Sequence, residues 1–235
     1  MATPKSDEPA GLASQRVADL LADRILTGRM RPGERIKQDE LASELQVSRI
    51  PVRDALRSLE ARGLVTIRAN AGARVTTLTI RDMEISYEIR ERLEPLLLRE
   101  SIPHLTDHDL AELSIAKERL DAVEDLDHYM PLSRDFHWIA FRGHRAPLLA
   151  QMVERLWDTT QNYRRAYALL ALEQPGRMAV MRAERDLLFG AIERRELDLA
   201  PRILAMHIRR THMALADHFH LHETMAVHDG QGDPE

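Results

Sequence analysis

The chain has 235 residues, 44% hydrophobic and 30% charged, which is typical of a globular protein large enough for two modest domains. It contains no cysteine, which excludes disulfides, thiolate metal sites and cysteine nucleophiles. The net charge is −5, but residues 1–75 contain 13 basic and 10 acidic residues, whereas the remainder contains 20 and 28. A mildly basic first part joined to an acidic second part favours a DNA-binding domain attached to a part that does not contact DNA.

The sequence shows no sign of membrane insertion or export. The longest apolar run, residues 166–172, covers only about two turns of helix, which is too short to span a bilayer. The first nine residues lack the basic start and apolar core of a signal peptide. We therefore expect a cytoplasmic protein with no membrane partner. Residues 1–10, which are polar and include two prolines, are predicted to be a disordered tail.

The first predicted domain, residues 11–76, opens with three helical patterns. Residues 12–27 have apolar residues at helical spacing and stop at Gly28, and a short strand is predicted at residues 34–36. A short helix follows, in which Leu41 and Leu45 share an apolar face. After a tight turn, Ser48 is expected to start the next helix by accepting a backbone N–H with its side chain.

That last helix has two distinct faces. Val52, Ala55, Leu56 and Leu59 form one apolar stripe, while Arg49, Arg53 and Arg57 repeat every four residues on a neighbouring basic stripe. Two short helices joined by a tight turn, the second with arginines at its N-terminal end, are typical of a helix-turn-helix.

A β-hairpin is predicted after Gly63. Residues 65–67 have strand propensity, Asn70 and Gly72 are turn formers, and Arg74 opens a second strand. A hairpin that follows a helix-turn-helix is a wing. Arg68 and Arg74 are expected to flank its tip.

Motifs at residues 28–33, 40–42, 47–56 and 63–65 occur in the order and spacing that resemble the N-terminal domain of GntR-family transcriptional regulators. The resemblance covers roughly residues 12 to 76. It implies a domain that binds double-stranded operator DNA. The family has arginine or lysine at some helix-turn-helix positions where this chain has Asp39, so the resemblance does not extend to DNA contacts from the first of the two helices.

Residues near the start of a recognition helix face base edges in the major groove, which predicts base contacts for Ser48, Arg49, Ile50 and Arg53. Arg49 or Arg53 is the better candidate for guanine, because an arginine matches its O6 and N7 atoms with two hydrogen bonds. Phosphate contacts are expected from the remaining basic side chains, and the wing tip completes the predicted set: Arg57, Arg68, Asn70 and Arg74.

Beyond a connector at residues 77–80, the sequence predicts helices alone. Their expected spans are 81–101, 106–125, 127–143, 147–172, 176–195 and 197–220. Short connections between them favour an antiparallel six-helix bundle. The fold class is therefore mainly α, with an N-terminal winged helix-turn-helix, a helical effector-binding and dimerisation domain at residues 81–222, and a flexible tail at residues 223–235.

The helical part resembles the ligand-sensing (FCD) domain of the FadR-type branch of GntR regulators, and its length is closer to the VanR-like six-helix subgroup. Residues 87–95, the Phe136-His137 pair and His207 are the basis of this resemblance. Many members of that branch bind a divalent metal through one aspartate and three histidines. Here Ser133 and Arg185 stand at two of those four positions, so we expect no metal cofactor. If a metal is bound, His137 and His207 are its predicted ligands.

Arg185 suggests a different way to hold an anion. An arginine can supply the positive charge of a metal and grip a carboxylate with two parallel hydrogen bonds. The predicted effector site, for a small acidic organic molecule, consists of Arg90, Ser133, His137, Arg185 and His207. The alternative is that Arg185 pairs with Glu94 or another carboxylate of the bundle and is purely structural, because buried charges are normally paired.

The predicted function is a ligand-responsive DNA-binding transcriptional regulator, a repressor released by its effector, which binds a pseudo-palindromic operator as a homodimer. One alternative is a constitutive DNA-binding protein whose bundle only dimerises. The other is an enzyme with its active site in the bundle. It is disfavoured because the sequence contains no nucleophile–base pair, glycine-rich phosphate loop or complete metal set.

Overall fold

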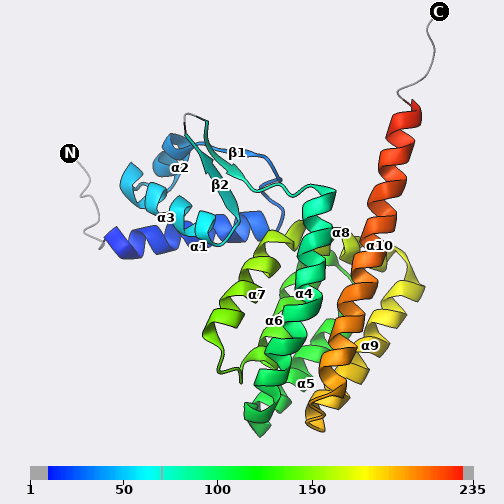
Figure 1. Ribbon diagram of the computed structural model, residues 1–235. Coiled ribbons are helices and arrows are strands. Elements are labelled where there is room, and N and C mark those ends of the chain that lie inside the picture. Colours follow the sequence, from blue (N-terminus) through cyan, green and yellow to red (C-terminus); the bar gives the residue numbers. More distant parts are fainter. Residues whose placement is uncertain (1–9, 70, 230–235) are drawn as a thin grey trace, which may run out of the picture. The chain divides into compact units, whose positions relative to one another are not determined.

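The computed structural model describes residues 10–69 and 71–229, with side chains described as far as Phe219 (Figure 1). These residues form two compact units. The first contains the chain up to Thr77 together with Trp157–Asn162, and the second contains the rest. Residues 1–9 of the tail predicted at residues 1–10, the wing-tip residue Asn70 and the end of the predicted C-terminal tail, residues 230–235, lie outside the described part, whereas Ala10 begins the first helix. The winged helix-turn-helix and the helical second part confirm the predicted fold class.

Three helices form the first unit around one apolar core: α1 (Ala10–Leu26), α2 (Gln38–Glu44) and α3 (Arg49–Ala61). The apolar stripe predicted for α3 is fully buried and packs on α1. This core contains Val17, Leu21, Ile25, Leu41, Val52, Ala55, Leu56, Leu59, Leu64, Val65 and Val75. Because one side of α3 is used entirely for packing, its arginine stripe is left on the outside.

The turn between α2 and α3 depends on backbone geometry. Gln46 has φ +54°, in the left-handed region that few non-glycine residues adopt. The N–H of Val47 donates to the carbonyl of Ala42 at 3.0 Å. Ser48 has the extended backbone of an N-cap, but its hydroxyl accepts no cap hydrogen bond, so that detail of the prediction is wrong. The exposed Ser48 side chain does not stabilise the helix end in this way.

The wing is a three-stranded antiparallel sheet in the order β1-β3-β2: β1 (Arg35–Ile36), β2 (Val65–Arg68) and β3 (Gly72–Val75). Alternate residues of β3, Ala73 and Val75, point into the core. Arg68 pairs with Gly72 next to the tip. Arg74 lies farther back, opposite Thr66 and Arg35, and does not flank the tip as predicted.

The second unit consists of long helices joined by short connections: α4 (Ile80–Ser101), the short 3-10 helix η1 (Ile102–His104), α5 (Asp107–Ala122), α6 (Leu126–Phe141), α7 (Pro147–Thr159), α8 (Gln161–Glu173), α9 (Pro175–Glu193) and α10 (Leu199–Asp229). Helices α4 and α10 lie side by side along their length (Figure 1). Thr79 and Thr106 cap α4 and α5 with reciprocal hydrogen bonds to Asp82 and Asp109.

Two predicted spans in this unit were wrong. The helix predicted over residues 147–172 is interrupted at Thr160, so the described residues after Thr79 form seven α-helices where six were expected. Thr159 and Thr160 are β-branched, and their hydroxyls compete for backbone hydrogen bonds, which weakens a helix at that point. Helix α10 continues to Asp229, so residues 223–229 of the predicted flexible tail are helical. Across the described residues, no helix is long and apolar enough to cross a membrane.

At Gly143 the backbone approaches other backbone atoms so closely that there is no room for a side chain. Its N–H donates to the hydroxyl of Ser101 at 2.9 Å, and that hydroxyl donates to the carbonyl of Ala140 at 2.7 Å. A Cβ at Gly143 would overlap the carbonyl oxygen of Ser101 and lie 3.0 Å from backbone atoms of His104 and Leu105. Backbone cannot move aside as a flexible side chain can. Gly143→Ala is therefore expected to cost about 1–3 kcal/mol of unfolding free energy.

Denaturant unfolding of Gly143→Ala beside Gly176→Ala measures this effect. Gly176 lies in the first turn of α9, and a Cβ there would meet nothing within 4 Å. Its replacement should leave stability unchanged or raise it by about 0.4–1 kcal/mol. Equal unfolding curves for the two variants would contradict the close approach at Gly143.

Candidate functional sites

The outward face of α3 contains the predicted base-reading residues. Ser48, Arg49, Ile50 and Arg53 are all exposed at its N-terminal end, and Arg57 is exposed one turn farther on. Ile50 is 60% exposed, unusual for a large apolar side chain, and it suits contact with a thymine methyl group. The positive end of the helix dipole adds to the attraction for phosphate at the same end. This face can therefore approach both base edges and the DNA backbone.

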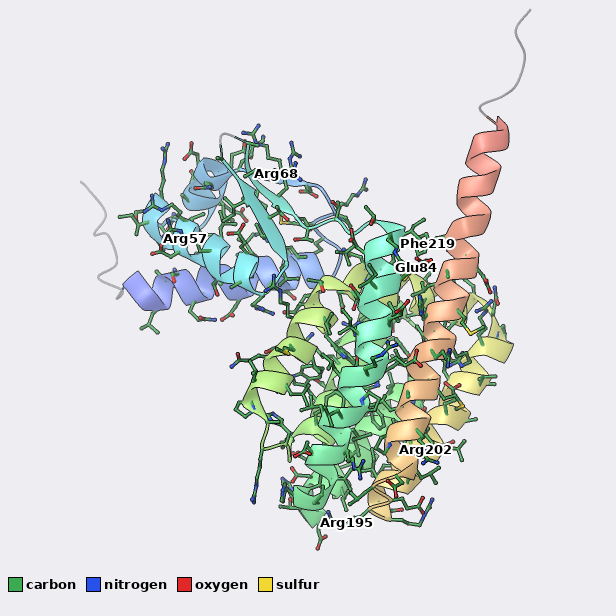
Figure 2. All side chains as sticks on the ribbon, in the orientation of Figure 1. Arg57, Arg68, Glu84, Arg195, Arg202 and Phe219 are labelled. Atoms are coloured by element: carbon green, nitrogen blue, oxygen red, sulfur yellow. The ribbon has the colours of Figure 1, made fainter. Side chains whose placement is uncertain are left out.

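One of the two wing arginines predicted to contact DNA also forms a hydrogen bond within the protein. Figure 2 labels Arg57 on α3 and Arg68 on β2, and both side chains are exposed. Arg74 is also exposed, but its guanidinium donates to the carbonyl of Gly33 at 2.9 Å and so ties β3 to the turn before β1. Arg68 thus remains a free candidate for a phosphate, while Arg74 has an internal role. Asn70 lies outside the described residues.

In the helical unit, α4 contributes a buried ion pair. Arg90 Nε lies 2.5 Å from Glu94 Oε1, and both residues are almost fully buried. The guanidinium of Arg90 also lies over the ring of Tyr87, 4.6 Å from its centroid. Burial alone would lower the pKa of Arg90, but Glu94 and Tyr87 together outweigh burial and raise it. Glu94 Oε2 accepts no hydrogen bond from the described residues, so this buried carboxylate has spare acceptor capacity.

The two predicted histidines lie near each other, with ring centroids 6.3 Å apart. His137 Nδ1 lies 2.7 Å from the backbone carbonyl of Ser133, so this nitrogen is assigned the proton that it donates. Burial lowers the pKa of His137 to about 3, with further contributions from His207, Arg164 and Arg90, so the ring is neutral at physiological pH. Ser133 therefore orients His137 through its backbone.

Glu184 of α9 holds His207 in place. The carboxylate accepts from His207 Nδ1 at 2.7 Å and from Arg210 at 2.5 Å. Burial alone would raise the pKa of Glu184, but these two hydrogen bonds lower it to about 2. Arg210 also donates to the hydroxyl of Tyr167 at 2.5 Å. The result is a cluster of charged residues between α8, α9 and α10 beside His137.

Arg164 of α8 is a member of this cluster that the sequence interpretation missed. It is only 8% exposed, and burial together with Arg90 lowers its pKa to about 9. The sequence signal that could have identified Arg164 is the one that identified Arg185, an arginine on an otherwise apolar stripe. Around Arg164 that stripe includes Tyr167, Ala168 and Ala171, all buried. The folded interior thus places Arg164, Arg90 and His137 within electrostatic reach of one another.

Arg185 does not belong to this cluster. Its Nε and Nη2 atoms lie 2.9 and 2.7 Å from Asp121 Oδ1 of α5. Asp121 also pairs with Lys117 at 3.0 Å, and Lys117 pairs with Asp186 at 2.6 Å. The prediction of Arg185 as the anchor of an effector therefore needs correction, because its charge is already neutralised by a carboxylate of the bundle. The structural alternative, in which Arg185 pairs with a bundle carboxylate, describes its contacts.

The donors do not fit the divalent metal that the resemblance implies. Ser133 uses its carbonyl to hold His137, Arg185 brings a positive charge, and Glu184 is occupied by His207 and Arg210. The two imidazole rings, with no carboxylate available as a further ligand, form a poor ligand set for a divalent ion. Across the described residues, no group of three or more His, Cys, Asp or Glu is arranged to hold a metal.

Together, an exposed recognition helix, a β-hairpin and a separate helical unit define a winged helix-turn-helix protein. Residues 13–75 match the family of bacterial regulatory proteins named gntR, and residues 84–210 match the FCD domain. The chain belongs to the GntR family and has an FCD domain.

Individual relatives agree with this assignment. The chain is 37% identical to the HTH-type transcriptional regulator YdhC of Bacillus subtilis over 46% of this chain and 47% of that one. It is 30% identical to the HTH-type transcriptional repressor GlaR of Escherichia coli over 61% of this chain and 69% of that one. The match thus spans less than half of the length of YdhC. The solved structure of E. coli McbR/YncC has the same fold, with a TM-score of 0.75 at 24% identity, over 88% of this chain and 98% of that one.

Proposed function

We propose that this chain is a DNA-binding transcriptional regulator whose helical unit senses a small acidic organic molecule. In this proposal it acts as a homodimer on a pseudo-palindromic operator, as a repressor that its effector releases. The exposed arginines at the start of α3 support the DNA-binding part. A two-fold dimer suits this role, because one recognition helix covers too few base pairs for useful specificity.

The observation that supports an acidic effector is a concentration of guanidinium groups in the interior of the helical unit. The cluster between α4, α8, α9 and α10 contains the buried guanidinium groups of Arg90 and Arg164 and the half-buried one of Arg210, together with the carboxylates of Glu94 and Glu184. The neutral ring of His137 and the ring of His207 add hydrogen-bonding groups. A carboxylate ligand would favour the charged form of Arg164, whose pKa is lowered to about 9 by burial and by Arg90. We therefore assign the anchoring role to Arg164 in place of Arg185.

The effector would be coupled to DNA binding through a difference in its affinity for two arrangements of the protein. An effector changes operator affinity only if it binds one arrangement of the protein better than another. The rival function, a constitutive DNA-binding protein whose bundle only dimerises, is favoured by the internal pairing of two buried arginines, Arg90 with Glu94 and Arg185 with Asp121.

A thermal-shift experiment with Arg164→Met separates these functions. The melting temperature of the variant without ligand is measured first and serves as the reference for its ligand response. In a panel of pyruvate, succinate and citrate, one acid at about 100 times its Kd should stabilise wild type by about 2.7 kcal/mol, but not the variant. The same acid should weaken binding of wild type to its operator duplex.

Arg165→Met is the matched control. Arg165 is the next residue of α8, half-buried, and it pairs with the exposed Asp127 at 2.9 Å. This variant should keep the ligand response. If no acid in a broader panel of carboxylates and organic phosphates shifts wild type, the constitutive function replaces the sensor.

A further inference from the structure

An acidic side chain lies beside the base-reading end of the recognition helix. Arg49, the first residue of α3, has its Nε atom 2.6 Å from Oδ1 of Asp39, the second residue of α2. Both side chains are highly exposed, at 75% for Arg49 and 66% for Asp39. The contact therefore lies on the open surface that would face DNA. It joins the two helices of the helix-turn-helix through their side chains.

Helix capping does not explain why Asp39 contacts Arg49. An acidic residue in the first turn of a helix is favoured by the helix dipole, and α2 has two such residues, Asp39 and Glu40. Glu40 pairs with Lys37 at 2.7 Å, three residues away on the same segment. Only Asp39 reaches the recognition helix. The two neighbouring carboxylates therefore share the dipole effect but differ in their partners.

The geometry of the contact matters for reading a base. Asp39 engages Nε of Arg49, while the terminal Nη1 and Nη2 atoms have no partner among the described residues. These terminal atoms can form the paired hydrogen bonds to guanine O6 and N7. An exposed arginine otherwise samples many rotamers and can contact a phosphate instead of a base. A carboxylate on Nε restricts those rotamers and leaves the reading atoms available.

The charge of Asp39 has a second effect. The first helix of a helix-turn-helix crosses the DNA backbone, so a carboxylate on α2 lies near phosphates and opposes sequence-independent binding. This repulsion weakens binding to every sequence alike. Holding Arg49 toward a base strengthens binding to one sequence, and it is therefore the effect that increases the ratio of specific to non-specific affinity.

We propose that Asp39 is a positioning residue for DNA recognition, which holds Arg49 toward one base pair of the operator and thereby sets the specificity at that pair. This inference rests on the proposed DNA-binding function. It assigns to Asp39 an effect on sequence preference rather than a direct contact with DNA.

Selection of bound duplexes from a random pool tests the proposal. The base pair read by Arg49 is defined as the position at which Arg49→Ala loses the preference of wild type. Asp39→Ala should reduce discrimination at that same position by about tenfold, within the range of one well-placed arginine–guanine contact. Asp39→Glu should restore most of it. Asp39→Ala combined with Arg49→Ala should match Arg49→Ala alone, because Asp39 acts through Arg49.

Glu40→Ala is the matched control, since it removes one negative charge from the same turn of α2 without touching Arg49. Both alanine variants should bind random duplex a few times more tightly than wild type, because each loses one charge that repels phosphate. Only Asp39→Ala should change the preference at the defined position. Equal melting temperatures of the two variants would show that α2 remains folded in both.

The outcomes separate the two levels of inference. If wild type selects a sequence and Asp39→Ala selects the same one with equal discrimination, the role of Asp39 is refuted while DNA binding stands. Loss of preference at every position alike would indicate a structural role and would also refute it. If wild type selects no sequence, the DNA-binding proposal fails, and the role of Asp39 fails with it.

Discussion

Replacing Glu94 by glutamine is expected to lower the free energy of unfolding by about 3–5 kcal/mol, the usual cost of breaking a buried ion pair. Glu94 is fully buried, and its Oε1 atom lies 2.5 Å from Arg90 Nε. Without this carboxylate, the guanidinium groups of Arg90 and Arg164 would repel each other in the interior with less compensation. Denaturant unfolding followed by circular dichroism measures the loss.

Glu88→Gln is the control for this variant. It makes the same chemical change on the same helix at an exposed position, so a change within about 0.5 kcal/mol is expected. Replacing both partners, as Arg90→Met with Glu94→Leu, should recover much of the stability, because two apolar side chains of similar volume avoid the cost of burying charge. Wild-type stability of Glu94→Gln would mean that the interior is more hydrated than the structure indicates.

Arg53→Ala is expected to weaken binding to the selected operator about 10- to 100-fold and to relax the preference at one base pair. Arg53 is exposed on the outward face of α3, one turn after Arg49. An arginine in that position can form two hydrogen bonds to a guanine, and alanine can form none. Fluorescence anisotropy with the operator duplex and with single-base variants of it measures both effects.

Arg57→Ala should behave differently from Arg53→Ala. As an exposed arginine farther along α3, it is expected to contact phosphate, so its loss should weaken binding to all sequences alike. The slope of log affinity against log salt should fall by about 1. Arg182→Ala, an exposed arginine on α9 in the other unit, controls for the change in net charge. If Arg53→Ala also weakens all sequences equally, Arg53 contacts phosphate and reads no base.

Local sequence was sufficient to predict the DNA-binding unit. The apolar stripes of α1 and α3, the turn at Gln46 and the hairpin at residues 65–75 all follow from side-chain periodicity and turn chemistry over a few residues. Those local signals agree with one another, which is why fold class and element order were predicted correctly. The cap hydrogen bond expected from the Ser48 hydroxyl was not predicted correctly, because a residue type permits a hydrogen bond without determining the side-chain rotamer.

In the helical unit, local sequence patterns were not sufficient for a correct prediction. Periodicity continues through Thr160, so the break between α7 and α8 was hidden in an unbroken apolar pattern. The same pattern identified Arg90, His137, Arg185 and His207 as polar residues on buried stripes. It could not say which of them meet, since a helix pattern specifies which face is buried but not the register against neighbouring helices.

The sequence by itself therefore determined the family resemblance, the order of the elements in the DNA-binding unit and the basic face of α3. Only the tertiary structure decided how the charges pair. Arg185 meets Asp121, 64 residues away on α5, and not the histidines, whereas Arg164 joins Arg90 and His137 although no motif includes it. The physical reason is that a buried charge needs a partner, and the partner of Arg185 lies on another helix. Helix packing, rather than sequence spacing, sets the distance between two such charges.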